Sequence, residues 1–391
     1  MIHEDGYSSG SERLFEHSES CRHSLIYHAK CMGLFRSEGN NPAPLGATKQ
    51  EKWQNYIRAE SSRRLGWAVF QYDSSVAYLH NNRPFLGLAD LNLNLPGSRE
   101  HWEAENADVW ASYHPWSKSV PITSPLRPKL ASFFDGSPDP AGNLSEEHLL
   151  IIALMLLSML WSIKEFRSFP LEDLARPLGY ENGPQAMMHA MDQIKVPILA
   201  MADSHTQSEM ERLVDRTQLA HIAHIYGAGD LMNWLFPYLR NDAERDTVKT
   251  RMLRWANEDH RRTREVTYHS AQILGLVRHY PSLMPVQSFL LFHAGVILSC
   301  MSFLLPRSST PCPGSPIQLE KLGSEESADL MRWLESGGSS VISLTGVPSL
   351  CCPTGRRLVL DQTASLLKRH KTWGIAGNLT KVILSLSKQD A

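Results

Sequence analysis

Apolar residues recur along this chain mostly at helical spacing, and period-two alternation over β-branched residues is scarce. Hydrophobic positions three and four residues apart indicate a helix packed on one side, whereas strands need alternation. The pattern therefore predicts an all-α fold, an irregular multi-helix bundle with long loops, and leaves a sheet hard to place. Helices are expected at 19–35, 48–81, 100–110, 149–163, 185–202, 206–226, 229–238, 243–279, 286–305, 324–335 and 358–371.

The stretch 48–81 is the most informative of these segments. It has no proline and one glycine, and Thr48 followed by Glu51 predicts a capping box at its start. On a helical wheel one face, within about 100°, collects Trp53, Ile57, Glu60, Arg64, Trp67 and Ala68. Glu60 and Arg64 lie one turn apart in the middle of this aromatic face. Because a buried pair fails when one partner is lost, we expect Arg64→Ala to lower the melting temperature more than apolar replacement of both residues.

Breaks in composition divide the chain into five parts. Residues 1–18 are expected to be disordered, and 19–112 to form a first helical part. Residues 113–143 are a proline-rich linker, and 144–305 form a second helical part of the same domain. Residues 306–391 are expected to be a loop-rich tail with short helices.

Two apolar runs raise the question of a membrane. The run 149–163 has 15 residues, fewer than the roughly 20 that a bilayer requires. The run 289–305 is bounded by Pro285 and Pro306 and contains His293. Both are interpreted as buried helices of a soluble protein, with no membrane partner.

Charge and composition exclude several classes of protein. The 391 residues carry 39 basic and 41 acidic side chains, a formal net charge of −2, with 42% hydrophobic residues. A domain that grips nucleic acid by charge alone is strongly basic, and a disordered chain is poor in apolar residues. Basic clusters are small, at 261–264 and 356–357. Six scattered cysteines favour a reducing compartment over a disulfide scaffold.

Several histidines and cysteines have spacings that a metal could use. Cys21, His23, His28 and Cys31 match no closed zinc site, so packing in a helix is the favoured interpretation. His221 and His224 form a weaker pair, with no carboxylate expected nearby. We therefore predict no metal-binding residue in the chain.

Catalytic patterns are equally weak. The Gly-x-Ser-x-Gly form at residues 6–10 lacks the strand that a nucleophile elbow needs, and no phosphate-binding glycine loop occurs. An all-α metal-dependent enzyme would have to use Asp242, Glu244 and Asp246, which lie among basic residues and fit a solvated helix start better. We predict that the protein is not an enzyme and has no catalytic residue.

A set of separated motifs in a fixed order resembles the regulatory region of fungal-specific transcription factors. That region reads approximately Trp-x3-Ile-x2-Glu-x2-Arg-Arg-Leu, then an aromatic residue, an Asp, a proline-containing loop, Leu-Pro and Trp-x-Ala. The resemblance covers about residues 20–112. The residues that carry it, and that we expect to be a structural signature, are Trp53, Ile57, Glu60, Arg63, Arg64, Leu65, Trp67, Asp73, Pro84, Pro96, Trp102, Ala104 and Trp110.

The resemblance implies a helical regulatory domain that follows a zinc-finger or zinc-cluster DNA-binding module. It implies a nuclear protein that controls RNA polymerase II transcription, as of a metabolic gene set, through protein partners of the transcription machinery. The zinc of the family belongs to that module, so no cofactor is expected in this chain. No matched residue is a DNA-binding residue, so DNA is expected to be reached only through a missing module or a partner protein.

The chain departs from the family pattern in one respect. It has neither a Cys-x2-Cys pair with later histidines nor a six-cysteine cluster, and the resemblance begins close to Met1. The expectation is a shortened gene model, or a regulator that acts through partners. Two alternatives stay open: the metal-dependent enzyme, which magnesium would stabilise, and an adaptor that binds a full-length transcription factor.

Overall fold

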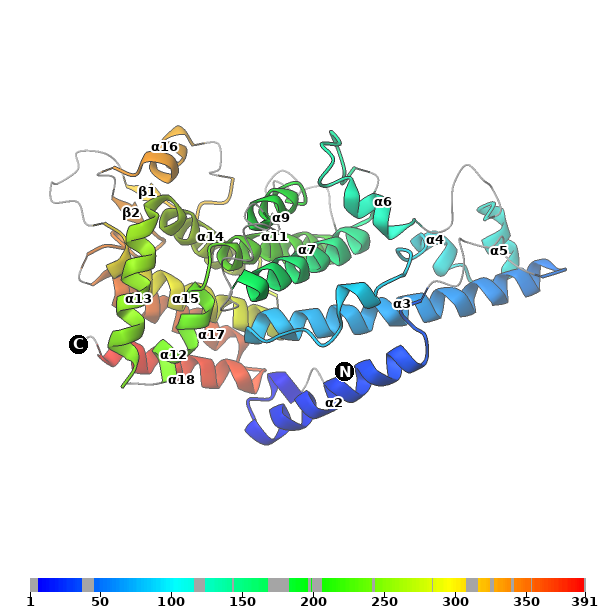
Figure 1. Cartoon of the computed structure of the whole chain (residues 1–391), viewed down its shortest axis with the longest axis horizontal. Coiled ribbons are helices and arrows are strands. Elements are labelled where there is room, and N and C mark those ends of the chain that lie inside the picture. Colours follow the sequence, from blue (N-terminus) through cyan, green and yellow to red (C-terminus); the bar gives the residue numbers. More distant parts are fainter. Residues whose placement is uncertain are drawn as a thin grey trace. The chain divides into compact units, whose positions relative to one another are not determined.

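The computed structural model describes residues 6–36, 46–115, 124–142, 144–167, 183–195, 198, 206–240, 243–282, 284–306, 316–323, 327–338, 341–352 and 354–389. These residues are largely helical, which confirms the all-α prediction (Figure 1). The chain forms two compact units. We call Ser20–Met159 the N-terminal unit, and Leu160–Ala391 with Met1–Glu19 the C-terminal unit. The five-part division drawn from composition stays a prediction.

The N-terminal unit is organised around one long helix, α3 (Lys49–His80). The Thr48 side chain accepts a hydrogen bond from the backbone N–H of Glu51, and the Glu51 side chain bonds back to Thr48, which confirms the capping box. Asn81, at φ 51°, ends the helix in the left-handed conformation. The other elements of this unit are most of α2 (Glu12–Cys31), η1 (Leu88–Asp90), α4 (Arg99–Trp102), α5 (Ala107–Ser112), α6 (Leu126–Ala131) and the first part of α7 (Glu146–Arg167).

Close packing along α3 explains its one glycine. A Cβ atom at Gly66 would lie 2.6 Å from the carbonyl oxygen of Leu34, so any other residue would push the two segments apart. Next to it, the Trp67 and Phe70 rings meet edge to face at 5.6 Å and are both buried. Ala68 is exposed, so the wheel placed it wrongly on the buried face.

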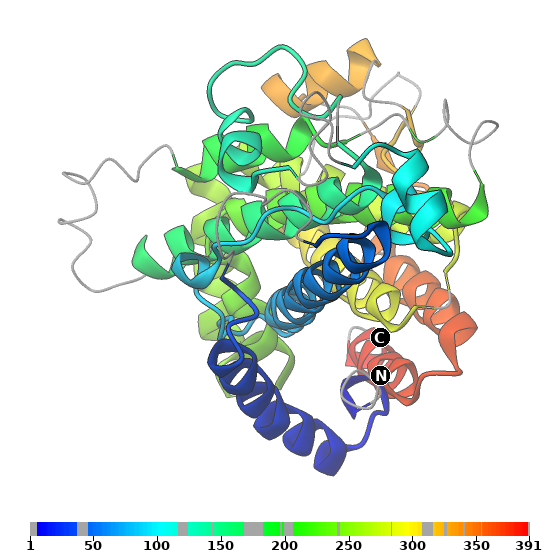
Figure 2. The same cartoon turned by 90° about the vertical axis from the view of Figure 1, so that its right-hand side faces the viewer.

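The C-terminal unit is a helical bundle around α15 (Pro285–Leu304), whose side chains are almost all buried. α15 packs against α14 (His260–His279) and α17 (Gly355–Leu367), and α17 packs against α18 (Gly374–Gln389). Figure 2 shows α15 in yellow beside α17 and α18 in orange-red. The remaining elements are α9 (Gly183–Asp192), α11 (Gln207–Gly227), α12 (Leu231–Arg240), α13 (Arg245–Glu258), α16 (Ala328–Ser336), η4 (Lys368–His370) and the parallel pair β1 (Ile317–Gln318) and β2 (Ile342–Ser343).

Three features of this unit differ from the expected helices. The predicted helix 243–279 is two helices, because Asp259 is extended at φ −150° and its side chain accepts a hydrogen bond from the N–H of Arg262, which caps α14. Helix α18 was not predicted, since glycines at 374 and 377 obscure its pattern. The β1–β2 pair is too short for sequence alternation to reveal.

The beginning of the described chain is helical rather than disordered. Residues 6–8 form a helical turn and α2 begins at Glu12, whereas we expected no structure through residue 18. The Tyr7 hydroxyl donates to Glu19 at 2.6 Å, and the Asn378 amide donates to the Gly10 carbonyl at 2.7 Å. The second contact joins residues 368 positions apart, so no local pattern could have announced it.

Among the described residues, two helices are long and apolar enough to span a membrane. They are the window Glu146–Glu165 in α7, which is 56% buried, and Pro285–Leu304, which is 89% buried. A core helix of a globular protein passes the same test, and the burial of the second window fits that interpretation.

Candidate functional site: an arginine–glutamate cluster on α3

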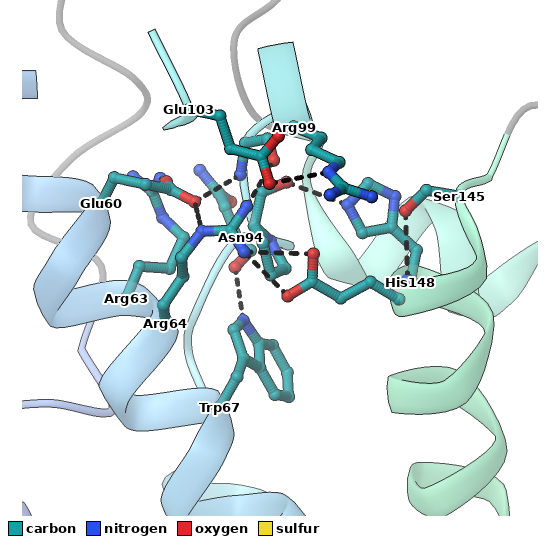
Figure 3. Close-up of polar contacts among 12 residues, drawn as sticks. Glu60, Arg63, Arg64, Trp67, Asn94, Arg99, Glu103, Ser145 and His148 are labelled. Carbon is teal, nitrogen blue, oxygen red and sulfur yellow. Dashed lines mark hydrogen bonds and ion pairs between the residues drawn. The ribbon is translucent and has the colours of Figure 1, made fainter. Parts of the chain in front are cut away.

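Glu60 is the centre of a polar cluster in the N-terminal unit (Figure 3). Its side chain is completely buried, although it lies in the middle of α3. One carboxylate oxygen accepts from Arg64 Nε at 2.8 Å and from the backbone N–H of Gly97 at 2.8 Å. The other accepts from Arg63 Nη1. Three donors therefore compensate the loss of water around this carboxylate.

Arg64 connects α3 to two other segments. Its Nη1 donates to both carboxylate oxygens of Glu147 in α7, at 3.0 and 3.2 Å, and its Nη2 donates to the Gly97 carbonyl at 2.9 Å. The guanidinium also lies 5.0 Å from the centre of the Trp102 ring. A planar group with several fixed donors suits this role better than an ammonium group would. We call Glu60, Arg63, Arg64, Gly97 and Glu147 the α3 cluster.

The loop 94–97 is held by side chains from both sides. The Trp67 indole N–H donates to the Asn94 carbonyl at 2.9 Å, and Nε2 of His148 bonds to the Pro96 carbonyl at 2.9 Å. Because a carbonyl only accepts, Nε2 carries the proton, and burial lowers the pKa of His148. Glu60 and Arg64 bind the N–H and the carbonyl of Gly97. These contacts of the loop with α3 use its backbone groups.

A second buried ion pair lies farther along α3. Arg22 of α2 bonds to Asp73 through Nε at 2.8 Å and Nη2 at 2.7 Å, and neither side chain has any exposed surface. Asp73 also accepts from the backbone N–H groups of Phe85 and Leu86, at 3.3 and 2.8 Å. The Arg22 guanidinium lies 4.5 Å from the centre of the Phe85 ring. This pair ties α2 and the segment after α3 to one carboxylate.

Most of the expected signature residues line the interior of the N-terminal unit. Trp110 packs with Tyr56, at 5.6 Å between ring centres, in a cluster that Trp53 and Ile57 also contact. Leu65 is 48% exposed and takes no part in it. Of the others, Glu60, Trp67, Asp73, Pro96, Ala104 and Trp110 are buried, and Trp53, Ile57, Arg63, Arg64, Pro84 and Trp102 are partly buried.

The sequence did not identify several partners of these residues. Arg22, Gly97 and Glu147 complete the two ion-paired sites, and Tyr56 completes the aromatic cluster, where burial and the Glu60 charge raise its pKa. Glu147 lies at the start of a strongly apolar helix, which is a weak signal at most. Arg22 has no local signal, because its partner is 51 residues away.

The C-terminal unit contains a different polar group, the histidine cluster of His221, His224, His269, Asp192 and Lys195. Nδ1 of His221 lies 2.8 Å from Nδ1 of His269, whose ring stacks on His224 at 3.9 Å. Asp192 binds both His224 Nε2 at 2.8 Å and Lys195 at 2.9 Å. Our expectation of no carboxylate near His224 was therefore wrong. Burial, more than the neighbouring charges, holds the pKa of both His221 and His269 well below the ordinary range.

Other candidate ligands do not assemble into a site. Among the described residues, no group of three or more His, Cys, Asp or Glu side chains is placed to hold a metal ion. His23 packs against the Phe85 ring at 5.6 Å, and Cys31 is exposed. Glu244 and Asp246 are exposed at the start of α13, while Asp242 lies outside the described residues.

Comparisons with known proteins agree with the resemblance seen in the sequence. Residues 6–167 match the family described as the fungal specific transcription factor domain. Zinc finger protein zas1 of Schizosaccharomyces pombe is 32% identical over 133 residues, which is 34% of this chain and 14% of that protein. The nicotinate catabolism cluster-specific transcription factor of Emericella nidulans is 24% identical over 89 residues, 23% of this chain and 10% of that protein. The chain thus spans a small part of these relatives, and no solved structure matches it.

Proposed function

We propose that this chain is a helical regulatory part of a fungal transcription regulator, because residues 6–167 match the fungal specific transcription factor domain. It acts in the nucleus on RNA polymerase II transcription, as of a metabolic gene set. It is not an enzyme and uses no cofactor of its own. DNA is reached through a DNA-binding module or a partner protein, and the helical surfaces bind proteins of the transcription machinery.

The observation that carries this proposal is the match of residues 6–167, which includes both ion-paired sites of α3. Their geometry suits a scaffold better than a reaction centre. The carboxylates of Glu60 and Asp73 are fully buried and engaged by arginines and backbone N–H groups, so they are not available to a substrate.

A tethering experiment tests the proposal. The full chain is fused to a sequence-specific DNA-binding module of unrelated origin, and reporter RNA is measured in fungal cells that carry the matching binding site. We expect the fusion to change reporter RNA relative to the module alone. A folded, nuclear fusion that leaves reporter RNA unchanged would contradict the proposed function.

Variants of α3 connect the effect to the site. Arg64→Ala removes the contacts to Glu60, Glu147 and Gly97, so the regulatory effect should fall. Arg58→Ala is the matched control, because Arg58 is exposed on the same helix and bonds only to Asn55 within the described residues. Arg64→Lys keeps the positive charge but cannot contact Glu60, Glu147 and Gly97 at the same time. Its change in reporter RNA should be intermediate, even if Arg64→Ala lowers the amount of folded protein.

A further inference from the structure

The last two helices of the chain are unusually basic. Residues 355–389, which form α17, η4 and α18, contain seven Lys and Arg residues against one acidic residue, Asp361. Their formal charge is +6, while the whole chain carries −2. The rest of the protein is therefore acidic, and positive charge is concentrated on this helical hairpin. No local run of basic residues indicates this concentration of charge, because the residues are spread over 35 positions.

Five of these cations have no ion-pair partner among the residues that the structure describes. Arg356 differs, because it donates to the Tyr238 hydroxyl at 3.1 Å, and Arg357 lies 4.0 Å from Asp361. The others are exposed, and the described part of the chain offers none of them an ion pair. They are Lys368, Arg369, Lys371, Lys381 and Lys388.

The five cations form an extended set rather than a pocket. Lys381 and Lys388 are two turns apart on the exposed side of α18, and residues 368–371 form the turn that joins α17 to α18. α18 has 16 residues and is therefore about 24 Å long. A single phosphate needs converging donors, whereas duplex DNA carries one charge for about every 1.7 Å of its axis. Cations spread over this length suit the polymer better than a small anion.

We propose that the exposed cations of the α17–η4–α18 hairpin bind the phosphate backbone of duplex DNA without reading its sequence. This contact adds to the proposed function, in which sequence-specific recognition of DNA is left to another module or a partner protein, and it does not depend on that function. It would hold the regulator near DNA whose sequence another module recognises. Backbone contacts of this kind position a protein on the duplex and carry no sequence information.

Two simpler explanations account for only part of the pattern. Cations at the end of a helix favour its dipole, which suits Lys368 and Arg369 after α17 and Lys388 in α18. Lys371, however, follows η4 and comes three positions before Gly374, the first residue of α18, and Lys381 is in the middle of α18, away from either end of the helix.

An import receptor that binds an extended basic peptide is the other explanation. Leu367, the last residue of α17, has no exposed surface, and His370 within the turn is 2% exposed. The backbone there is fixed by packing, so it would have to unfold to become an extended ligand. The folded hairpin therefore favours DNA.

Salt-dependent binding of the full chain to a short fluorescent duplex tests the proposal. Fluorescence anisotropy gives the affinity between about 50 and 200 mM salt, where each phosphate contact contributes about 0.9 to the slope of log affinity against log salt. The variant Lys368→Gln/Arg369→Gln/Lys371→Gln should lose about 0.9 of slope for each contact removed. The charge-conserving variant Lys368→Arg/Arg369→Lys/Lys371→Arg should bind like the wild type.

A matched control separates position from net charge. Lys249→Gln/Arg251→Gln/Arg254→Gln also removes three positive charges, but from the exposed side of α13, elsewhere in the C-terminal unit. We expect its slope to stay close to that of the wild type. Equal loss of slope in both variants would overturn the proposal, as would absence of binding by a wild-type chain whose circular dichroism is helical.

Polyglutamate provides the last arm of the test. It has a high density of negative charge but not the spacing of phosphates along a duplex. If it displaced DNA at an equal concentration of charges, an acidic protein would be the better occupant and the DNA proposal would fail. None of these outcomes bears on the reporter measurement, so the two proposals fail separately.

Discussion

In the N-terminal unit arginines bind the buried carboxylates of Glu60 and Asp73. In the C-terminal unit the buried His221 and His269 bond to each other, and burial lowers the pKa of both. In the first case the opposite charge and backbone N–H groups replace the water that burial removed. In the second case burial favours the uncharged form of each ring. The stability of the N-terminal unit therefore depends on paired charges, and that of the C-terminal unit depends on uncharged histidines.

The difference lies in what each interior can tolerate. A buried ion pair fails when one partner is removed, because the other charge is left without compensation. The histidine pair fails when the solution becomes acidic. One Nδ1 donates to the other, and two protonated rings would present two N–H groups to each other at 2.8 Å. Substitution should therefore destabilise the N-terminal unit most, and a fall in pH should destabilise the C-terminal unit most.

The largest effect is expected at Asp73. Asp73→Asn places an amide where Arg22 and two backbone N–H groups require an acceptor with full charge, in a site with no exposed surface. Unfolding free energy, measured in urea, should fall by about 3–5 kcal/mol. The control Asp108→Asn removes a carboxylate that is 84% exposed and should stay within about 0.5 kcal/mol of wild type. Similar losses in the two variants would mean that the Arg22–Asp73 pair is hydrated.

Acidification should act next, on the C-terminal unit. Because the folded-state pKa of His221 and His269 is lowered, only the unfolded chain takes up protons below its ordinary pKa of about 6.5. The contribution of the two neutral histidines to the unfolding free energy is thus fully present above that pH and is lost as the pH falls. Each proton costs about 1.4 kcal/mol per pH unit, so two sites predict a loss of about 2–3 kcal/mol between pH 7 and about 5.5.

Hydrogen exchange locates this pH effect. Amides of α11 and α14 should lose protection on acidification more than those of α3. The N-terminal unit also has two histidines whose pKa burial lowers, His101 of α4 and His148 of α7, but they are less buried. Burial raises the pKa of Asp215 to about 6, so the folded state favours its protonated form. This group therefore stabilises the fold more as the pH falls, which opposes the trend of the histidines. The variant His221→Gln/His269→Gln isolates the pair. If its stability varied with pH as steeply as the wild type, the pair would not be the cause.

Arg64→Ala should cost about 2–3 kcal/mol of unfolding free energy, less than Asp73→Asn because the Arg64 side chain is 20% exposed.

The geometry changes the expectation for the apolar double variant. Glu60→Leu/Arg64→Leu leaves the N–H and carbonyl of Gly97 without partners, and each unsatisfied group costs about 1–3 kcal/mol. We now expect the double variant to be no more stable than Arg64→Ala; a clearly milder loss would show that loop 94–97 finds other partners. Arg58→Ala again serves as the control.

The smallest effect is expected from magnesium. Glu244 and Asp246 are exposed at a helix start, where water competes for their carboxylates. Saturating Mg²⁺ should shift the melting temperature by no more than about 1 °C relative to chelator, since only a ligand that prefers the folded state stabilises it. A larger shift that is abolished in Glu244→Gln/Asp246→Asn would support the alternative that the protein is a metal-dependent enzyme.

Local signals predicted much of the fold. The capping box of Thr48 and Glu51 and the absence of proline located α3 to within one residue at each end, because both signals act inside one helix. The break between α13 and α14 was missed because Asp259, a helix-capping residue, lies inside a continuous helical pattern. Helix α18 and the folded residues 6–8 were missed because contacts between distant segments stabilise them.

The candidate site was predicted in part for the same reason. Periodicity placed Glu60 and Arg64 on one side of α3, and both have buried or partly buried side chains. Their other partners, Gly97 and Glu147, come from segments 37 and 83 residues away, which no helical wheel can include. The histidine cluster was likewise divided between His221 and His224 of α11 and two other helices.

The central structural claim is that Glu60, buried in α3, holds loop 94–97 as part of a scaffold. The most direct measurement is the exchange rate of the Gly97 amide, which donates to Glu60 at 2.8 Å. In the wild-type chain this amide should be protected almost as strongly as the central amides of α3, and Glu60→Gln should release it selectively. A Gly97 amide that exchanges in the wild type at the rate of an exposed loop would contradict the account.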